Sequence, residues 1–218
     1  MDSVPFKFCD AVAAILTQSP ETTAFSPYSP WKAALDDHRI NRKCVNVYFT
    51  YSNRSWKYHC VQTPVSGTSE QPLLTFVDVL AMPRKYLRVV SFQFFCGFPL
   101  KYEATQGEIL EMATLLKNYA NESFFIARMA STQTDCLKDV LPCFQAASFQ
   151  KITLTYGGKC YEDFLRSHLK NDRLIEIEMY NSGWSREFLI EVGTYMLRTN
   201  TNHSFVFRRH GKKAMLVY

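Results

Sequence analysis

The chain has 218 residues, and 47% of them are hydrophobic, including 17 phenylalanines and 12 tyrosines. This apolar content is enough for a sizeable core and argues against a disordered chain, while no apolar run reaches the roughly 18–20 residues of a transmembrane helix. The net charge of +5 is mild, and the basic run at 208–213 is typical of a solvated tail, with a patch for an acidic partner as the alternative.

The first forty residues predict a small helical head. Segment 4–16 has a proline suited to the first turn of a helix, and its apolar residues recur at helical spacing: Phe8, Val12, Ile15 and Leu16. The polar stretch 17–30 contains three prolines and predicts a loop or an extended arm. A second short helix is expected to begin near Trp31.

The next segments predict a hairpin and a further strand. Residues 44–51 and 56–61 are rich in β-formers and are joined by the turn S-N-R-S, which is typical of a β-hairpin. After an exposed loop, residues 72–80 predict a short helix or a buried turn. The β-branched and aromatic residues 86–96 predict a strand.

From residue 105 onward, helices and strands alternate. Thr105 and Glu108 form a capping-box signal at the start of a helix, and residues 136–147 have a helical spacing that Pro142 must kink or end. The other elements of this region are strands at 123–129, 149–155, 174–180 and 204–208, and helices at 160–169 and 184–198.

A short pattern recurs in three of these strands. It reads F-F-I-A-R-M from Phe124, F-Q-K-I-T-L from Phe149 and L-I-E-I-E-M from Leu174, at two intervals of 25 residues, and a similar figure begins at Leu87. The period and the pattern resemble degenerate leucine-rich repeats, whose strand–helix units stack because none buries its apolar face alone. We therefore expect a mixed α/β fold with a largely parallel sheet. The alternative is an ordinary α/β or α+β domain without a true repeat.

The head resembles an F-box. Val4 and Pro5 open its first helix, and Trp31 follows 26 residues after the proline. An F-box-like head before such a body resembles the lineage-expanded F-box and F-box-associated proteins of nematodes, as do the segments M-D-S-V-P-F and C-Y-E-D-F-L-R-S-H-L-K-N-D-R-L. An F-box continues with an apolar helix where this chain has the proline-rich segment 19–30, so the head is a degenerate version. The resemblance implies a head at 1–40 and an F-box-associated-like domain at 41–218.

This resemblance implies a non-enzymatic protein–protein interaction module, such as a substrate-recognition adaptor of a ubiquitin ligase or a degenerate relative of one. A Skp-type linker protein would be one partner, and the head residues expected to bind a partner are Val4, Pro5, Phe8, Val12, Ile15, Leu16, Trp31 and Leu35.

On the sheet, we expect one face to present the variable positions to a protein partner. The expected residues are Ser91, Arg128, Lys151, Thr153, Glu176 and Glu178. The 25-residue interval places Ser91, Arg128, Thr153 and Glu178 in one row and Val89, Ile126, Lys151 and Glu176 in the next. Lys151 beside Glu176 would form a cross-strand ion pair.

The sequence contains no recognised catalytic motif. The run Gly157–Lys159 lacks the spacing of a phosphate loop and predicts a tight turn. Glu176 and Glu178 have no nearby histidine to form an acid–base pair. The densest group of possible zinc ligands lacks the close spacing of structural sites: Cys136, Cys143, Cys160 and His168. We expect no catalytic residue, metal or cofactor. A small-ligand-binding domain and a cryptic enzyme remain the alternatives, together with a nucleic-acid-associated protein.

The sequence also indicates a compartment. It begins M-D-S-V-P, with an acid where a signal peptide carries positive charge, and its seven cysteines lack C-x-x-C spacing. We expect reduced thiols in an intracellular protein, cytoplasmic or nuclear. Phe and Tyr fall at periodic core positions and do not alternate with Lys and Arg, which argues against nucleic acid as a partner.

Overall fold

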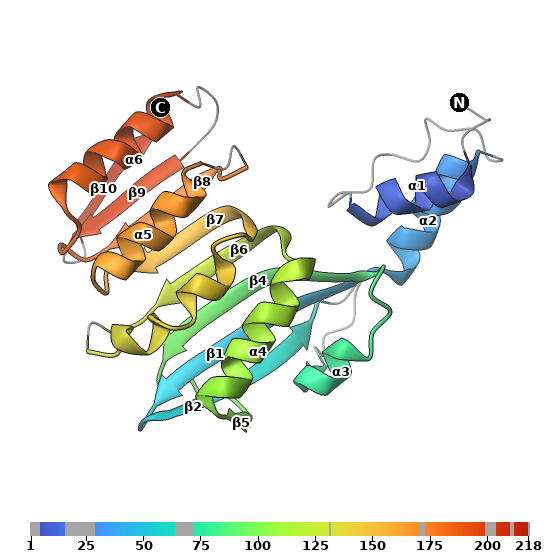
Figure 1. Ribbon diagram of the computed structural model, residues 1–218, viewed down its shortest axis with the longest axis horizontal. Coiled ribbons are helices and arrows are strands. Elements are labelled where there is room, and N and C mark those ends of the chain that lie inside the picture. Colours follow the sequence, from blue (N-terminus) through green and yellow to red (C-terminus); the bar gives the residue numbers. More distant parts are fainter. Residues whose placement is uncertain are drawn as a thin grey trace.

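The computed structural model describes residues 5–15, 29–63, 72–130, 132–170, 173–198, 204–209 and 212–217. These residues form a mixed α/β structure with one large, mostly parallel sheet (Figure 1), which confirms the expected fold class. The predicted head residues Val4 and Leu16, the side chain of Ile15 and most of segment 17–30 lie outside the described residues.

Ten strands of the described residues form the sheet, in the order β10-β9-β8-β7-β6-β4-β1-β2-β3, with β5 paired to β2. The strands are β1 (Lys43–Ser52), β2 (Ser55–Gln62), β3 (Leu73–Leu74), β4 (Leu87–Cys96), β5 (Tyr102–Ala104), β6 (Asn121–Arg128), β7 (Ser148–Thr155), β8 (Glu176–Tyr180), β9 (Ser204–Arg209) and β10 (Lys212–Val217). The strands β1, β4, β6, β7, β8 and β9 are neighbours in this order, and each pairs in parallel with the next strand of the series. At the two ends of this series, β1 pairs antiparallel with β2, and β9 pairs antiparallel with β10.

The main helices of this body cover one face of the sheet (Figure 1). They are α4 (Gln106–Leu116), α5 (Lys159–His168) and α6 (Arg186–Arg198), and the shorter α3 (Phe76–Leu80) lies beside the β1–β2 hairpin. Three 3₁₀ turns accompany them: η2 (Lys117–Tyr119), η3 (Thr134–Leu137) and η4 (Leu141–Phe144). No helix among the described residues combines the length and the apolar composition that a bilayer crossing requires.

Aromatic rings join the helices to the sheet. The ring of Phe125 on β6 lies 5.5 Å from Phe94 on β4, 4.9 Å from Phe164 on α5 and 5.3 Å from Phe144 on η4. All four side chains are essentially inaccessible to solvent. Burying each contributes roughly 1.5–3 kcal/mol relative to exposure. The alternation of side chains along a strand thus turns one apolar face of the sheet toward the helices.

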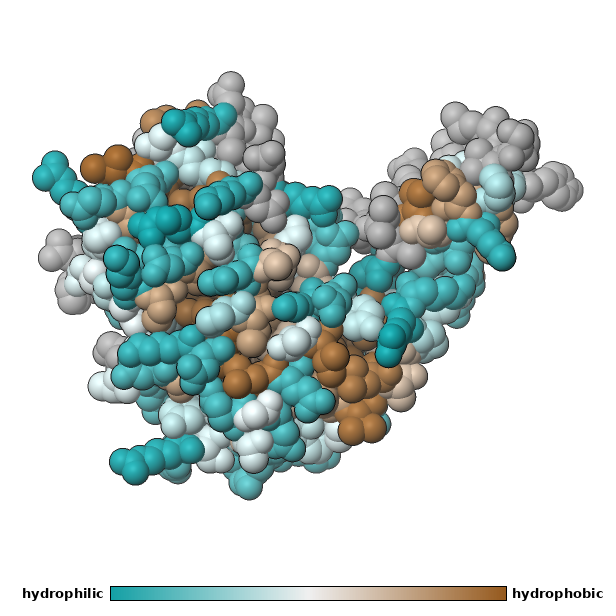
Figure 2. Space-filling view, in the orientation of Figure 1, coloured by the Kyte–Doolittle hydropathy of each residue, from teal (hydrophilic) through white to brown (hydrophobic). Residues whose placement is uncertain are grey.

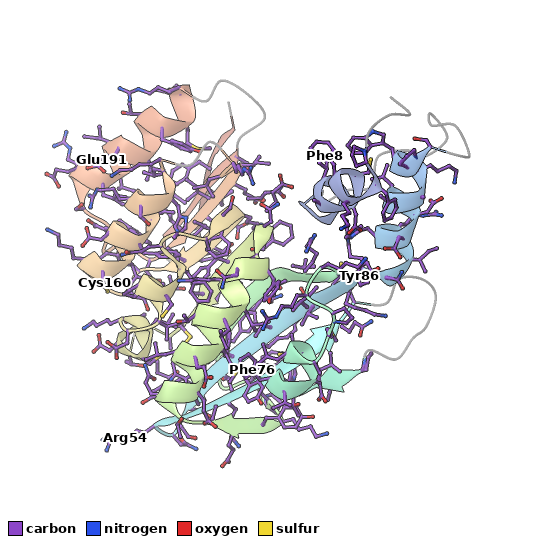
Figure 3. All side chains as sticks on the ribbon, turned by 45° about the vertical axis from the view of Figure 1, so that its right-hand side comes forward. Phe8, Arg54, Phe76, Tyr86, Cys160 and Glu191 are labelled. Atoms are coloured by element: carbon purple, nitrogen blue, oxygen red, sulfur yellow. The ribbon has the colours of Figure 1, made fainter. Side chains whose placement is uncertain are left out.

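Local signals fix several element boundaries as predicted. Thr105 and Glu108 make both hydrogen bonds of a capping box at the start of α4. Asn53 and Arg54 have φ angles of 51° and 62°, so the β1–β2 turn adopts the left-handed conformations that match the twist of a hairpin. Arg54 lies at the tip of this hairpin (Figure 3).

The recurring pattern does not align at 25 residues throughout. Ser123 pairs with Phe149, and Phe124 pairs with Lys151, because the register of β6 and β7 shifts twice near the start of β6. Phe124 consequently points away from the helices and is 38% exposed, whereas Phe149 and Leu174 are buried. The prediction that 124, 149 and 174 occupy equivalent buried positions is therefore wrong for 124. A bulge changes which face a side chain occupies, and a fixed period cannot detect it.

Other segments also differ from the sequence predictions. Residues 136–147, expected as one kinked helix, form parts of two 3₁₀ turns, and Pro142 lies at the start of the second. Residues 208–209 and 212–213 of the basic run belong to the paired strands β9 and β10 and not to a tail, and residues 210–211 lie outside the described residues. Strands β3 and β5 were not predicted, because two and three residues are too few to show an alternating pattern.

The described part of the head contains two helices, α1 (Phe6–Ile15) and α2 (Pro30–Asn41), and it projects from the body (Figures 1 and 2). Its small apolar cluster is separate from the core of the body and is formed by Cys9, Ala13, Ala34 and Leu35, with Trp31 packed against it. Ser29 caps α2, because its side chain accepts a hydrogen bond from the backbone N–H of Trp31.

The register of β6 is testable with two adjacent phenylalanines. Phe125→Ala should lower the free energy of unfolding by about 3–5 kcal/mol, because it empties a ring-lined core site. Phe124→Ala is the matched control and should cost about 1 kcal/mol or less, because its ring faces solvent. Urea unfolding monitored by circular dichroism measures both values. Equal losses, or a larger loss for Phe124→Ala, would contradict the register.

Stability should also fall in mild acid because of His168. This side chain is 2% exposed and packs against Phe149 and Phe164, and burial lowers its pKa from 6.5 to about 4. The unfolded chain therefore takes up the proton first as the pH falls. Protonation of His168 in the unfolded chain therefore lowers the free energy of unfolding. This loss is absent above about pH 6.5 and complete near pH 4, where it is on the order of 3 kcal/mol.

Replacement of this histidine isolates its effect. The His168→Leu variant should lose less stability than the wild type between pH 7 and pH 5, because it has no histidine to titrate at this position. Its free energy of unfolding should therefore depend less on pH. Urea unfolding at both pH values measures the difference. An identical pH dependence in wild type and variant would show that His168 is not the titrating group.

Candidate functional site

The face of the sheet opposite the helices is the candidate functional site, and we call it the open face. Its outward side chains form three rows across the parallel strands. In the order β1, β4, β6, β7, β8, the first row is Asn46, Ser91, Phe124, Lys151 and Glu176, and the second is Tyr48, Gln93, Ile126, Thr153 and Glu178. The third row begins with Thr50, Phe95 and Arg128 and continues with Thr155 and Tyr180.

All six residues predicted for a sheet face lie on the open face: Ser91, Arg128, Lys151, Thr153, Glu176 and Glu178. Ser91, Thr153 and Glu178 are buried, however, so only Arg128, Lys151 and Glu176 of this set are accessible to a partner. Their predicted rows are partly wrong. Ser91 is in the row of Lys151, and Arg128 lies in the third row, one step beyond Thr153. Val89 does not belong to this face at all, because it pairs with Val45 and is buried in the core. The β6 bulge displaces Arg128 relative to Thr153, and a second register shift, between Val45 and Asn46, accompanies the placement of Val89 in the core. Ser91 is in a different row because it pairs with Phe124 and not with Arg128.

A charge network occupies the β6–β8 part of the open face, with Glu178 at its centre. Its carboxylate accepts hydrogen bonds from Arg128 Nη2 at 3.3 Å, Lys151 Nζ at 3.5 Å and Thr153 Oγ1 at 3.2 Å. Lys151 also donates to Glu176 Oε1 at 2.9 Å, as the cross-strand prediction requires. The guanidinium of Arg128 lies 5.2 Å from the centre of the Tyr180 ring, and the Tyr180 hydroxyl is 3.3 Å from Glu178.

The pKa values of this network favour its ionised form. Burial acts to raise the pKa of the Glu178 carboxyl, but Lys151, the Thr153 hydroxyl and Arg128 together hold that pKa below its usual value. Burial likewise acts to lower the pKa of Lys151, yet hydrogen bonding and attraction to Glu176 and Glu178 raise it. Glu178 is thus a carboxylate at neutral pH and accepts hydrogen bonds, and its partners are cations and hydroxyls that form no nucleophile–base pair.

The β1–β6 part of the open face is less charged. Phe124 is 38% exposed, Ile126 and Phe95 are half-buried, and the Tyr48 ring makes an edge contact with His59 at 5.1 Å. Ser91 donates to Asn46 Oδ1 at 2.6 Å. This part offers apolar and aromatic contact area beside hydrogen-bonded polar groups.

The head places its predicted partner residues unevenly. Pro5 and Phe8 are exposed, and Val12 is half-buried. Trp31 is half-buried and meets the Phe8 ring edge-on at 5.9 Å. Leu35 is 2% exposed and packs in the head's own core, so its side chain is not available on this surface. Phe6, which the sequence analysis did not select, is 47% exposed beside Phe8 on α1.

A polar cluster that the sequence analysis missed joins the head to the body. Tyr86 donates to Asp37 Oδ2 at 2.6 Å, and Lys85 Nζ lies 3.2 Å from the same oxygen and 3.6 Å from Asp10. His38 Nε2 is 2.9 Å from Asp10 Oδ1. Among the described residues, Asp10, Asp37 and His38 are the one group close enough to hold a metal ion. Lys85 already supplies a positive charge there. Tyr86 lies at this junction, below α2 (Figure 3).

Several residues of chemically reactive types, and the Gly157–Lys159 run, have structural roles. Gly158 has a φ of +106° and caps α5, and a side chain at Gly157 would clash with Tyr161, so this run is a tight turn. His59 and Cys60 point to opposite faces of β2, and burial raises the pKa of the Cys60 thiol to about 12. Glu162, one of two adjacent acids, is buried and accepts hydrogen bonds from the backbone and hydroxyl of Ser185, before α6.

Three comparisons with known proteins bear on identity. The chain matches no protein-family model, no curated protein and no solved structure. The resemblances to F-box proteins and to leucine-rich repeats therefore stay predictions, and function is argued from the geometry of the chain.

The charge network on the open face is testable through Glu178. Glu178→Gln should lower the free energy of unfolding by about 1–3 kcal/mol at pH 7, because it leaves two cations without their shared carboxylate. A depressed carboxyl pKa stabilises the fold above the unfolded-state pKa of about 4.3 and loses this effect as pH falls through the folded value. The difference between wild type and variant should therefore shrink toward pH 3.

Glu111→Gln on α4 is the control for this measurement, because Glu111 is exposed and lies outside the network. Its effect should stay within about 0.5 kcal/mol at both pH values. Urea unfolding at pH 7 and pH 3 tests the pair. If Glu178→Gln costs no more than Glu111→Gln at pH 7, the network does not stabilise the fold.

Proposed function

We propose that the protein is a non-enzymatic docking module that binds another protein through the open face. The observation that carries this proposal is the uneven covering of the sheet, because α4, α5 and α6 pack on one face only (Figure 1). Parallel sheets are usually covered on both faces. No helix of the described residues covers the opposite face, so that face presents a rigid surface to a partner.

The composition of the open face suits a protein partner. Phe124, Ile126 and Phe95 offer apolar and aromatic area near its middle, and Lys151 and Glu176 carry opposite charges at its side. Protein interfaces commonly combine an apolar, aromatic centre with a polar rim. Mixed charge also disfavours a polyanion as the ligand of this face.

A finer proposal concerns the head. The exposed rings of Phe6 and Phe8 on α1 would bind a second protein. Following the F-box resemblance, this second protein would be a Skp-type linker and the open face would bind a client. The chain would then be an intracellular substrate adaptor of a ubiquitin ligase, or a degenerate relative of one. No catalytic residue is assigned.

The two surfaces can be tested separately by affinity purification and mass spectrometry of the full chain. Phe124→Glu with Ile126→Glu should remove proteins bound to the open face, because charges would enter its apolar centre. Phe6→Asp with Phe8→Asp should remove only proteins bound to the head. We expect each double variant to lose a different set of proteins, by roughly tenfold or more.

Val77→Glu is the matched control, because Val77 is 73% exposed on α3 and lies outside both surfaces. It should leave both sets of co-purifying proteins unchanged. Circular dichroism should show that every variant is folded. If the open-face variant keeps the same specific proteins as the wild type, docking on the open face is wrong. If the head variant does so, the linker proposal is wrong.

A further inference from the structure

A basic cavity lies at the edge of the sheet where the parallel strands begin. Its volume is about 780 Å³. Its lining residues include a single acidic side chain, Glu122, and five basic side chains: Arg84, Lys85, Arg88, Lys117 and Arg173. The open face is a different surface of the molecule, and an assignment for this cavity does not depend on the proposed docking function.

The parallel topology brings these cations together. Strands β4, β6, β7 and β8 run in the same direction, so the residues that precede them meet at one edge. Arg84 precedes β4, Lys117 precedes β6 and Arg173 precedes β8. This edge is next to the head, as the position of Tyr86 in Figure 3 shows.

The positive charge of the cavity is not balanced within its lining. Asp10 and Asp37 already pair with Lys85. Arg173 also donates to the side-chain oxygen of Asn121 at 2.7 Å. Apart from Lys85, the lining contains four basic side chains and one acidic side chain, Glu122.

Arg88 is the most constrained of these cations. Its side chain is half-buried on β4, and its Nη1 donates to the backbone carbonyl of Leu87 at 2.6 Å. Its Nε is buried and has no hydrogen-bond partner in the part of the chain that the structure describes. Burial, together with the neighbouring Arg42, lowers the pKa of Arg88. Arg88 lines the cavity, and an unsatisfied guanidinium donor is a group that a bound anion would satisfy.

The backbone at this edge is also unusual. Glu122 has a φ of 57° and is skipped in the pairing of β6 with β7, which passes from Asn121 to Ser123. Left-handed backbone at a non-glycine residue is costly and is often retained at binding sites. Here the bulge brings both Asn121 and Glu122 into the lining of the basic cavity.

We infer that this cavity binds a phosphate ester, carried by a small molecule or by a phosphorylated side chain of a partner protein. Guanidinium groups match the geometry of phosphate oxygens and bind them with paired hydrogen bonds. The cations come from three separate segments and surround one concavity, which suits a compact, multiply charged group. A nucleic-acid backbone would instead follow an extended basic stripe.

The test is isothermal titration calorimetry of the full chain with three probes: inorganic pyrophosphate, a phosphoserine peptide and its unphosphorylated form. The wild type should bind pyrophosphate saturably and more weakly as salt rises. Arg84→Gln with Lys117→Gln should weaken binding by roughly tenfold for each cation removed, and Arg88→Gln should weaken it similarly. Because Arg84 is exposed and Lys117 lies on a surface turn, the double variant tests the site even if Arg88→Gln does not fold.

Lys170→Gln with Arg198→Gln is the matched control, because these cations line a separate groove between α5 and α6. It should bind the probes within about twofold of the wild type. Tight binding of the phosphopeptide, but not of its unphosphorylated form, would support a partner protein as the source. Binding of pyrophosphate alone would support a small ligand.

Two outcomes would overturn the inference. One is that the wild type shows no saturable pyrophosphate binding, or that the control variant loses as much binding as the cavity variants. An equal loss in the control would indicate general charge attraction. The other is that a single-stranded oligonucleotide binds more tightly than both phosphate probes and that the cavity variants lose this binding. That result would assign the cavity to nucleic acid.

Discussion

The contact of Phe125 with Phe94 on the neighbouring strand and with Phe164 on α5 is the interaction on which this structure depends. It joins two strands and a helix in one dry cluster, to which Phe144 and Phe149 are added. Because side chains alternate along a strand, the residues between these rings point to the opposite face, which carries charged groups such as Glu178 and also aromatic rings such as Phe124. The asymmetry of the molecule, with helices on one side and an open face on the other, follows from this packing.

Two charged regions of the sheet differ in how their charges are compensated. On the open face, Glu178 lies among Lys151 and Arg128, so cations and carboxylates neutralise one another. At the edge where the strands begin, Arg84 and Arg88 face a cavity that contains a single acid among its lining residues. A network with balanced charges suits the rim of a protein interface, whereas a cavity with an excess of positive charge suits a small anionic group. The same parallel topology positions both regions.

The local signals of the chain were enough to predict much of the fold. The capping residues Thr105 and Glu108 located α4, and the β-branched and aromatic run at 86–96 located β4. The six sheet residues expected on one face do share it, because period-two alternation holds along the part of each strand that contains them. Their rows were predicted less well, since Glu122 bulges out of β6 and the register shifts beside it. Repeat spacing contains no information about such a shift.

The sequence by itself determined the fold class, the parallel strands and the absence of recognised catalytic motifs. Only the tertiary structure decided which surfaces those strands create. Lys85 and Asp37 are 48 residues apart and form an ion pair, and Arg84, Lys117 and Arg173 come from distant segments that line one cavity. Their proximity results from strand pairing and chain topology, which are set by long-range packing. Local residue patterns indicate the secondary-structure propensity of each segment, but they do not indicate which other segments will pack beside it.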